Sequence, residues 1–303
     1  MGSTTSWIRS RHSTQTPRPA GTPLAVEWQD RYLDVDGVRA HYLEAGAGKT
    51  VVLVHGALAW CCAELTYGAV IGPLSRSFHV VAVDVVGFGL TAGRGPQDFS
   101  AAAQGDFLVA FLQRLGRRAH LAGNSHGGWL VQYAAHQVPD HVDRLVIINS
   151  LNGTSPIPAD YPLPRDTEAA PTPEGVGHYL RDFYLHPEPV TPARVQRTTE
   201  VWVQNFDFAR ERRAVMGRTP ESWNRNLHYQ GAHISERAGD LHRPVLLTWS
   251  RENTGASPAD AAAFLNRLPD GELHVITGAK HHVQTEHPER WADVVTRFLQ
   301  SPR

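Results

Sequence analysis

One serine constrains this chain most, because it lies between two glycines where a strand pattern gives way to a helix pattern. Residues 123–127 read GNSHG and fit G-x-S-x-G. The apolar run RAHLAGN (118–124) precedes the serine, and a helical segment at 126–137 follows it. Joining the two so abruptly requires a sharp backbone turn with small flanking residues. The sequence therefore predicts a strained turn that exposes the Ser125 hydroxyl beside a helix N-terminus.

Strand-like and helix-like segments alternate through most of the chain. Six runs are β-branched and nearly continuous in apolar residues, as in parallel strands buried on both faces: 50–55, 78–87, 118–124, 144–150, 244–250 and 272–277. Helical candidates lie at 101–115, 126–137, 257–268 and 287–300. A turn signal at Asp36-Gly37 adds an antiparallel hairpin at the start. The pattern predicts an α/β core.

Residues 151–240 interrupt this alternation. The interruption includes the proline-rich stretch PIPADYPLPRDTEAAPTPEG, which suits neither helix nor sheet, and continues with amphipathic helical stretches at 175–186 and 193–216. We expect a helical lid here, inserted between the core segments 28–150 and 241–303. Residues 1–27 are polar and rich in Ser, Thr and Pro, and lack a stretch of signal-peptide length. They are expected to form a flexible tail.

Composition narrows the classes of function. The 303 residues carry a net charge of -1, so no basic excess exists to neutralise nucleic-acid phosphates. No apolar run approaches the ~20 residues that cross a bilayer. The only cysteines, Cys61 and Cys62, are adjacent and are expected to be buried thiols, and the histidines form no metal-binding motif. We expect a cytoplasmic protein with a small-molecule substrate, no metal, no cofactor, no nucleic-acid or membrane partner, and possible homo-oligomers.

Two further segments supply what acyl transfer from a serine needs. His55-Gly56 ends a predicted strand and lets the chain turn, so that the Ala57 N–H can hold an oxyanion together with the N–H of His126. The segment TGAKHHVQTEHPERW follows the last strand. Either His281 or His282 in that segment can serve as the general base.

The chain resembles the α/β-hydrolases over residues 30–300, and within them most closely the meta-cleavage-product hydrolases, which cut carbon–carbon bonds. The matching segments are LVHG, VDVVGFG, GNSHGG, PVLLTWSRE and ELHVITGAKHHVQTEHPE, with YLRDFYLHPEPVTPARVQ in the lid. The resemblance implies an α/β-hydrolase fold. This is a mostly parallel eight-stranded sheet flanked by helices, with the helical lid inserted after strand 6.

The resemblance also implies roles for particular residues. Ser125 maps onto the nucleophile, and His281 opens the pattern H-x-x-Q-x-E-H-P whose first histidine is the base. The oxyanion donors map onto Ala57 and His126. Substrate contacts are expected from Gly56, Asn124, His282 and Trp202. Asp84, the remaining carboxylate at a strand end, is usually structural in such relatives.

The pattern departs from the family at the residue that should orient the base. Relatives carry G-x-x-D after the seventh strand, whereas WSRENTG places Asn253 at the aspartate, with Glu252 beside it. Three outcomes are open: Glu252 restores a triad, Asn253 orients a weaker base, or covalent catalysis is lost. The lid arginine and the tryptophan after the catalytic histidine are also replaced, by Thr198 and His282.

The sequence therefore predicts a serine-nucleophile hydrolase that acts on an ester, thioester or carbon–carbon bond of a small apolar metabolite. The alternative is a non-hydrolytic lyase, cyclase, isomerase or cofactor-free oxygenase of the same fold that uses His281 as its base. GNSHGGW also resembles the cofactor-free dioxygenases of this fold, although Asn149 stands where their acid lies. A ligand-binding protein without turnover is the third possibility.

Overall fold

The computed structural model describes residues 28–150, 170–217, 219, 221–222, 224–225, 229, 234, 236–253 and 255–302. The predicted tail at 1–27 and most of the predicted proline-rich stretch lie outside these residues.

Eight strands form one sheet in the order β1-β2-β4-β3-β5-β6-β7-β8. The strands are β1 (Gln29–Val35), β2 (Val38–Ala45), β3 (Thr50–Val54), β4 (His79–Val83), β5 (Ala119–Asn124), β6 (Val142–Ile148), β7 (Val245–Ser250) and β8 (Gly271–Ile276). The first two pairings, β1 with β2 and β2 with β4, are antiparallel, and the others are parallel. The predicted mostly parallel eight-stranded sheet is confirmed.

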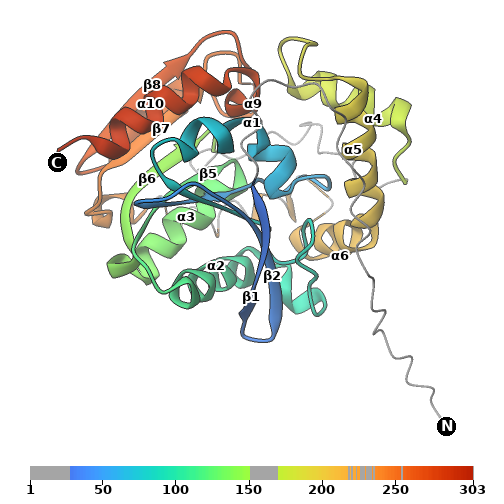
Figure 1. Ribbon diagram of the computed structural model, residues 1–303, viewed down its shortest axis with the longest axis horizontal. Coiled ribbons are helices and arrows are strands. Elements are labelled where there is room, and N and C mark those ends of the chain that lie inside the picture. The colour runs from blue at the N-terminus through green and yellow to red at the C-terminus, as the bar shows by residue number, and fades with distance from the viewer. Residues whose placement is uncertain are drawn as a thin grey trace.

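Nine α-helices have both bounds within the described residues. They are α1 (Ala63–Ser75), α2 (Ala101–Leu115), α3 (His126–Gln137), α4 (Pro173–Phe183), α5 (Pro192–Gln204), α6 (Phe206–Met216), α8 (Pro258–Leu265), α9 (Val283–Glu286) and α10 (Pro288–Gln300). Helices α1, α9 and α10 contact one another on one face of the sheet, and α2 packs against α3 on the other (Figure 1). Helices α4, α5 and α6 follow β6 in the chain and lie together at one side of the sheet (Figure 1).

The hairpin and the amphipathic helices lie where their patterns predict them. Asp36 and Gly37 take the positive φ angles of 50° and 83° that a two-residue turn requires, and Val35 pairs with Val38. Helices α2 and α3 match the predicted ranges 101–115 and 126–137. Both patterns are local, so the sequence displays them without knowledge of the tertiary structure.

Helix α1 was not predicted. Its buried residues include Ala63, Leu65, Thr66, Tyr67, Val70, Ile71 and Leu74, which leave no regular polar stripe. Gly68, Gly72 and Pro73 also lie within it. A helix that is buried around most of its circumference shows no 3.6-residue alternation, so periodicity misses it. The short helix α9 was missed as well.

The helical stretch expected at 193–216 is two helices. Asn205 interrupts it, and the Asn205 amide donates to the Val201 carbonyl at 2.8 Å. The prediction of helix was right, but the break was not foreseen, because an asparagine side chain that bonds a nearby backbone carbonyl leaves no mark in the apolar spacing.

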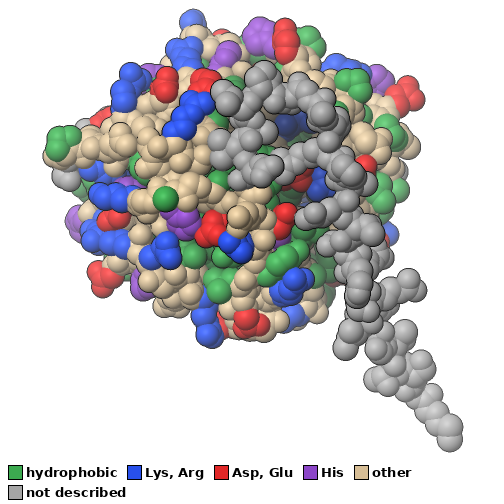
Figure 2. Space-filling view, viewed as in Figure 1, with side chains coloured by type: hydrophobic (Ala, Val, Ile, Leu, Met, Phe, Trp, Pro, Cys, Tyr) green, Lys and Arg blue, Asp and Glu red, His purple; other side chains and the backbone are tan. Residues whose placement is uncertain are grey.

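Both cysteines are buried and neither is in a disulfide, as predicted. Within the described chain, no helix combines the length and the apolar character needed to cross a bilayer. Figure 2 shows acidic and basic side chains interspersed over one face, which agrees with the small net charge of -1.

Candidate active site

Ser125 lies at the sharp turn that joins β5 to α3. Its backbone has φ 56° and ψ -120°, a conformation that costs an L-residue about 1–3 kcal/mol. The Ser125 N–H donates to the Ile148 carbonyl of β6 at 2.9 Å. A Cβ on Gly123 would lie 2.1 Å from the Gly127 carbonyl oxygen, and a Cβ on Gly127 would lie 2.1 Å from that of Val54. The two glycines are therefore required for strand and helix to approach this closely.

The loop after β3 lies directly against this serine. A Cβ on Gly56 would lie 3.3 Å from the Ser125 Cβ and 3.7 Å from its Oγ. The His55 ring shapes the loop: its Nε2 accepts the Val85 N–H at 3.0 Å, so its Nδ1 carries the proton and donates to the Gly56 carbonyl at 2.7 Å. In a trans peptide the carbonyl and the following N–H point in opposite directions. The Ala57 N–H is therefore held facing away from His55.

His126 is the first residue of α3, where backbone N–H groups have no acceptor within the helix. The expected oxyanion donor is the backbone N–H of His126, and the side chain makes separate contacts. The Nε2 lies 2.7 Å from Gln104 Oε1, and the ring stacks on Trp129 with 6.0 Å between centroids. Burial lowers the pKa of His126 to about 4, so the ring is neutral at neutral pH.

His281 is brought to the same edge of the sheet by its backbone. It lies between β8 and α9, and its carbonyl accepts from the side-chain amides of Asn124 at 3.4 Å and Asn149 at 3.0 Å. Asn124 immediately precedes the nucleophile candidate. These bonds tie the His281 loop to the turn at Ser125, although the two are 156 positions apart in the chain.

Asn253 contacts the imidazole of His281. The Asn253 Oδ1 lies 3.0 Å from His281 Nδ1, and the Asn253 Nδ2 donates to the Ala256 carbonyl at 2.7 Å. Trp249 Nε1 donates to the same carbonyl at 2.8 Å. A carbonyl can only accept, so the amide NH₂ faces Ala256 and the amide oxygen faces the ring. His281 Nδ1 must then carry the proton, which leaves the Nε2 lone pair able to accept a proton as a base.

Glu252 has a different place. Its Oε2 accepts from the backbone N–H groups of Gly278 at 3.0 Å and Ala279 at 3.4 Å. The carboxylate thus braces the turn that leads to His281. Of the two residues proposed to orient the base, the structure brings Asn253 to the ring and uses Glu252 elsewhere.

The charge around His281 differs from that of an aspartate-based triad. Burial lowers the pKa of His281 to about 4, and no carboxylate of the described residues offsets that loss. His281 is therefore a neutral ring at pH 7 in the tautomer that can remove a proton. The amide orients it but does not stabilise its protonated form.

Asn149, which the sequence analysis placed only where the acid of the cofactor-free dioxygenases lies, is also a residue of this site. It follows β6 with φ 44°, and its amide bonds Ser250 through both atoms, with Ser250 N–H donating at 2.8 Å. The same NH₂ also reaches the carbonyls of Lys280 and His281. Its position at the carboxyl end of a parallel strand was the one available signal.

The predicted substrate contacts divide into two groups. Gly56 and Asn124 lie beside Ser125, as described above. His282 is buried, and its ring lies 5.3 Å from Trp60 and 5.6 Å from Tyr184 between centroids. Trp202 packs on Tyr179, 5.0 Å between centroids, where α4 meets α5. The structure thus places His282 next to the base and Trp202 within the helices that follow β6.

Metal binding finds no support among the residues that the structure describes, since no three His, Cys, Asp or Glu side chains are arranged to hold an ion. The chemistry available at this site is that of a serine hydroxyl, a neutral imidazole and backbone N–H donors.

Known proteins resemble the chain over most of its length. The chain is 26% identical over 282 residues to 2-hydroxy-6-oxo-6-(2'-aminophenyl)hexa-2,4-dienoic acid hydrolase of Metapseudomonas resinovorans, which covers 89% of this chain and 90% of the relative. A 2-hydroxy-6-oxononadienedioate/2-hydroxy-6-oxononatrienedioate hydrolase of Paraburkholderia phymatum is also 26% identical, with 86% of this chain and 91% of the relative covered.

Solved structures show the same fold. A crystal structure of a meta-cleavage product hydrolase superposes with a TM-score of 0.76 at 23% identity, and covers 89% of this chain and 97% of its own. A 2-hydroxy-6-oxo-6-phenylhexa-2,4-dienoate hydrolase from a Rhodococcus strain gives a TM-score of 0.74 at 20% identity, with 91% of this chain and 100% of its own covered. Residues 49–288 match the family described as alpha/beta hydrolase fold. The chain therefore belongs to the alpha/beta hydrolase fold family.

Proposed function

We propose that this protein is a serine hydrolase of small, largely apolar carbonyl compounds, with Ser125 as nucleophile, His281 as general base and Asn253 as the residue that orients the base. The observation that carries the proposal is the Asn253–His281 contact, because the locked amide selects the tautomer that can accept the serine proton. The relatives that the chain resembles are named as hydrolases of 2-hydroxy-6-oxo dienoates. Ring-fission products of this kind are the first substrates to try.

In the proposed reaction, Ser125 Oγ attacks the substrate carbonyl as His281 Nε2 takes its proton. The N–H groups of Ala57 and His126 hold the oxyanion that forms. The proton then passes from His281 to the leaving group, which is a carbon, oxygen or sulfur atom. Water deacylates the serine by the same sequence of transfers.

The neutral orienter changes the energetics of this reaction. In a serine protease, replacing the triad aspartate by asparagine lowers kcat ~10⁴-fold, in large part because the amide stabilises the wrong tautomer. Here Ala256 and Trp249 hold the amide in the productive orientation. Only the charge is missing, so we expect slow but genuine hydrolysis.

The residues around His282 suggest what the substrate carries. His282 Nε2 and Trp60 Nε1 are buried and have no hydrogen-bond partner in the described chain. Burial lowers the pKa of His282 well below its ordinary value, so this ring is neutral. Unpaired buried polar groups cost about 1–3 kcal/mol each, and a bound ligand can recover that cost. We propose that an uncharged carbonyl or hydroxyl group of the substrate binds there, beneath a lid formed by residues 151–240 in which Trp202 lines the substrate side.

Active-site labelling tests the proposal. A fluorophosphonate probe should modify Ser125 in the folded protein, and should fail with Ser125→Ala. The exposed Ser77→Ala is the matched control and should label like the parent. Loss of the dienoate absorbance of 2-hydroxy-6-oxo-6-phenylhexa-2,4-dienoate, and release of p-nitrophenol from p-nitrophenyl butyrate, report turnover. Folded protein that neither labels nor turns over any ester, thioester or dienoate would contradict the hydrolase.

The neutral orienter keeps one alternative in view, a non-hydrolytic reaction in which His281 alone moves protons. That reaction would survive Ser125→Ala and be lost with His281→Ala, whereas the hydrolase loses activity with either. We propose that the protein is active without a metal, a cofactor or a nucleic-acid partner. We also propose that it is located in the cytoplasm. Turnover that survives dialysis against EDTA is the expected result for an enzyme that needs no metal ion.

A further inference from the structure

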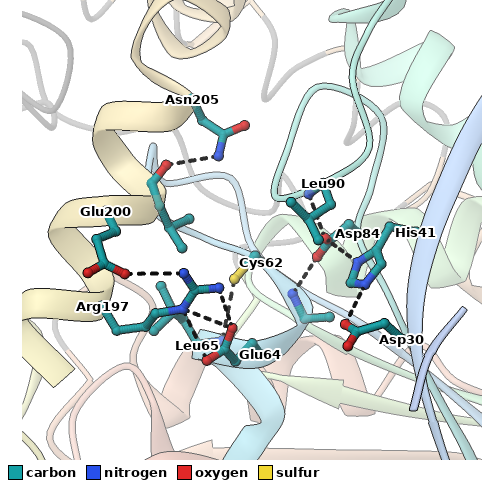
Figure 3. Close-up of polar contacts among 12 residues, drawn as sticks. Asp30, His41, Cys62, Glu64, Leu65, Asp84, Leu90, Arg197, Glu200 and Asn205 are labelled. Carbon is teal, nitrogen blue, oxygen red and sulfur yellow. Dashed lines mark hydrogen bonds and ion pairs between the residues drawn. The ribbon is translucent and has the colours of Figure 1, made fainter. Parts of the chain in front are cut away.

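We call residues 56–62 the oxyanion loop. A second polar cluster, formed by His41, Asp84 and Asp30, contacts the residues that flank this loop. His41 of β2 is buried and bonds a carboxylate through each ring nitrogen. Nδ1 lies 2.8 Å from Asp84 Oδ2, and Nε2 lies 2.9 Å from Asp30 Oδ1 (Figure 3). Asp84 is itself only 2% exposed. The cluster thus joins β1, β2 and the turn that follows β4.

The geometry determines the charge of this histidine. An ionised carboxylate can only accept hydrogen bonds, and a neutral imidazole has a single N–H. Both contacts are satisfied together only when the ring is an imidazolium. Burial opposes that charge, but the hydrogen bonds and charges of Asp84 and Asp30 outweigh it and raise the pKa of His41. Burial likewise opposes ionisation of Asp84, yet the pKa of that carboxyl is lowered, chiefly by His41.

Asp84 connects this ion to the oxyanion loop. Its Oδ1 accepts the Ala63 N–H at 2.7 Å, and its Oδ2 accepts the Leu90 N–H at 2.8 Å (Figure 3). Ala63 opens α1, directly after the loop. At the other end of the loop, His55 accepts the N–H of Val85, the neighbour of Asp84. The loop that carries the Ala57 N–H is therefore held at both ends by residues 84 and 85.

We propose that His41 is a positioning residue of the oxyanion hole: its imidazolium keeps the Asp84 carboxylate ionised and oriented, and Asp84 in turn fixes the loop that presents the Ala57 N–H. When alkaline pH removes the His41 proton, one carboxylate contact is lost and the loop loosens. The inference rests on the proposed hydrolase function, and it predicts a basic limb in the pH profile that does not come from the nucleophile or the base.

The other charged and titratable groups near the cluster do not replace His41. Across a small pocket, Arg197 of α5 pairs with Glu64 at 2.7 Å and with Glu200 at 3.4 Å (Figure 3). Burial raises the pKa of the Cys62 thiol well above its ordinary value, so it stays protonated. On the remaining sides lie the Tyr32 ring of β1, 5.2 Å from the His41 ring between centroids, and His55, whose pKa burial lowers.

The same pair of strands offers a matched control. At the opposite end of β2 and β4, His79 Nε2 lies 2.8 Å from Glu44 Oε1, and His79 Nδ1 lies 3.1 Å from Thr50 Oγ1. This is also a buried histidine bridged to a carboxylate between neighbouring strands, but it lies at the amino end of β4, away from the oxyanion loop. His79→Gln therefore removes a similar bridge without touching the loop.

The experiment compares His41→Gln with His79→Gln, using fluorophosphonate labelling rates and kcat and KM for p-nitrophenyl butyrate. Losing one oxyanion donor costs ~10²–10³ in rate, so a loosened donor should cost His41→Gln about 10- to 100-fold in kcat, with KM within about twofold. His79→Gln should stay within about twofold of the parent in both, since it lies outside the site. The basic limb of the parent profile should vanish in His41→Gln. Equal losses in the two variants, or a basic limb that persists in His41→Gln, would overturn the proposal.

Asp30→Asn covers the case in which His41→Gln does not fold. The Asp30 side chain is 54% exposed, so its replacement should be tolerated. Removing one of two carboxylates lowers the pKa of His41, and the basic limb should move to lower pH. An unmoved limb counts against the proposal.

Hydrogen exchange separates failure of this inference from failure of the hydrolase. If the parent protein neither labels nor hydrolyses, the proposed function falls, but amide exchange over residues 56–63 still reads the loop. Faster exchange there in His41→Gln than in His79→Gln supports the positioning role. Equal exchange in the two variants overturns it.

Discussion

Two histidines of this protein donate an Nδ1 proton to an oxygen and have opposite acid–base character. His41 contacts the Asp84 carboxylate at 2.8 Å, and His281 contacts the Asn253 amide oxygen at 3.0 Å. Burial opposes the charged form of both rings. The pKa of His41 is nevertheless raised, whereas that of His281 is lowered to about 4. The charge of the partner, and not the burial of the ring, decides which form the protein keeps.

The difference fits the two tasks. A ring that must hold an aspartate in place benefits from a permanent charge, because the carboxylate then stays ionised in a buried site. A ring that must accept a proton has to be neutral beforehand. Asn253 secures that state and the correct tautomer, but it leaves the imidazolium formed during reaction without a counter-charge.

Removing the neutral base should have the largest effect. We expect His281→Ala to lower kcat for p-nitrophenyl butyrate by about 10³-fold or more, because general base activation of the serine is lost. His287→Ala, at the junction of α9 and α10, is the control and should keep most of the activity. Comparable losses in the two variants would mean that the loop, and not the imidazole, is what matters.

A carboxylate partner for His281, like the one that His41 has, should make the two histidines more alike. Asn253→Asp places a carboxylate on His281 Nδ1, which raises the pKa of His281 and stabilises the imidazolium. We expect kcat to rise by about tenfold or more above the pKa of the base. The acid limb of the pH profile should move to higher pH. A variant no faster than the parent, with an unmoved acid limb, would show that the base does not limit the reaction.

Acid stability follows from the same difference. Four histidines have a pKa lowered to about 4 from the ordinary value of 6.5: His120, His126, His136 and His281. Between pH 6.5 and pH 4 these histidines are therefore protonated in the unfolded chain but neutral in the native protein. Stability from these groups is therefore present above pH 6.5 and is lost as the pH falls toward 4. Urea unfolding at about pH 7 and pH 5 measures this loss of stability. Equal unfolding free energies at about pH 7 and pH 5 would rule out the expected uptake of protons.

His41 has the opposite pH dependence, since the stability that it contributes is lost as the pH rises through its raised pKa.

His120 provides the smallest test, because it is a buried histidine whose ring nitrogens have no hydrogen-bond partner among the described residues. It lies 2% exposed on β5 against Phe78, and neither ring nitrogen has a hydrogen bond within the described chain. His120→Phe removes two unpaired polar atoms, so we expect the free energy of unfolding to rise by about 1 kcal/mol. His41→Phe, which removes an ion pair partner, should lower it. A destabilised His120→Phe would point to a bound water that pairs the ring.

Much of the fold was predictable because its signals are local. Continuous apolar runs located the strands, and amphipathic spacing located α2 and α3. Helix α1 escaped because burial on most sides erases that spacing, and the interruption at Asn205 depends on one side-chain bond. The elements that position Ser125 were thus mostly foreseen, and the element that follows the oxyanion loop was not.

The site divides in the same way. Gly56 follows β3, and Asn124 and Ser125 end its parallel neighbour β5, so the strand-end pattern predicted that they meet at one edge of the sheet. The choice between Glu252 and Asn253 rests on a carbonyl three residues further on and on the Trp249 ring. The His41 cluster joins three segments by the register of the sheet. Contacts of that kind follow from the folded arrangement and carry no local pattern.

The ring state of His281 in the folded protein tests the central claim most directly. Nitrogen-15 NMR of the imidazole distinguishes its two tautomers and follows its titration. The account predicts the Nδ1–H tautomer at neutral pH, with protonation only as the pH approaches about 4. An Nε2–H tautomer, or a ring already protonated at pH 6.5, would contradict it.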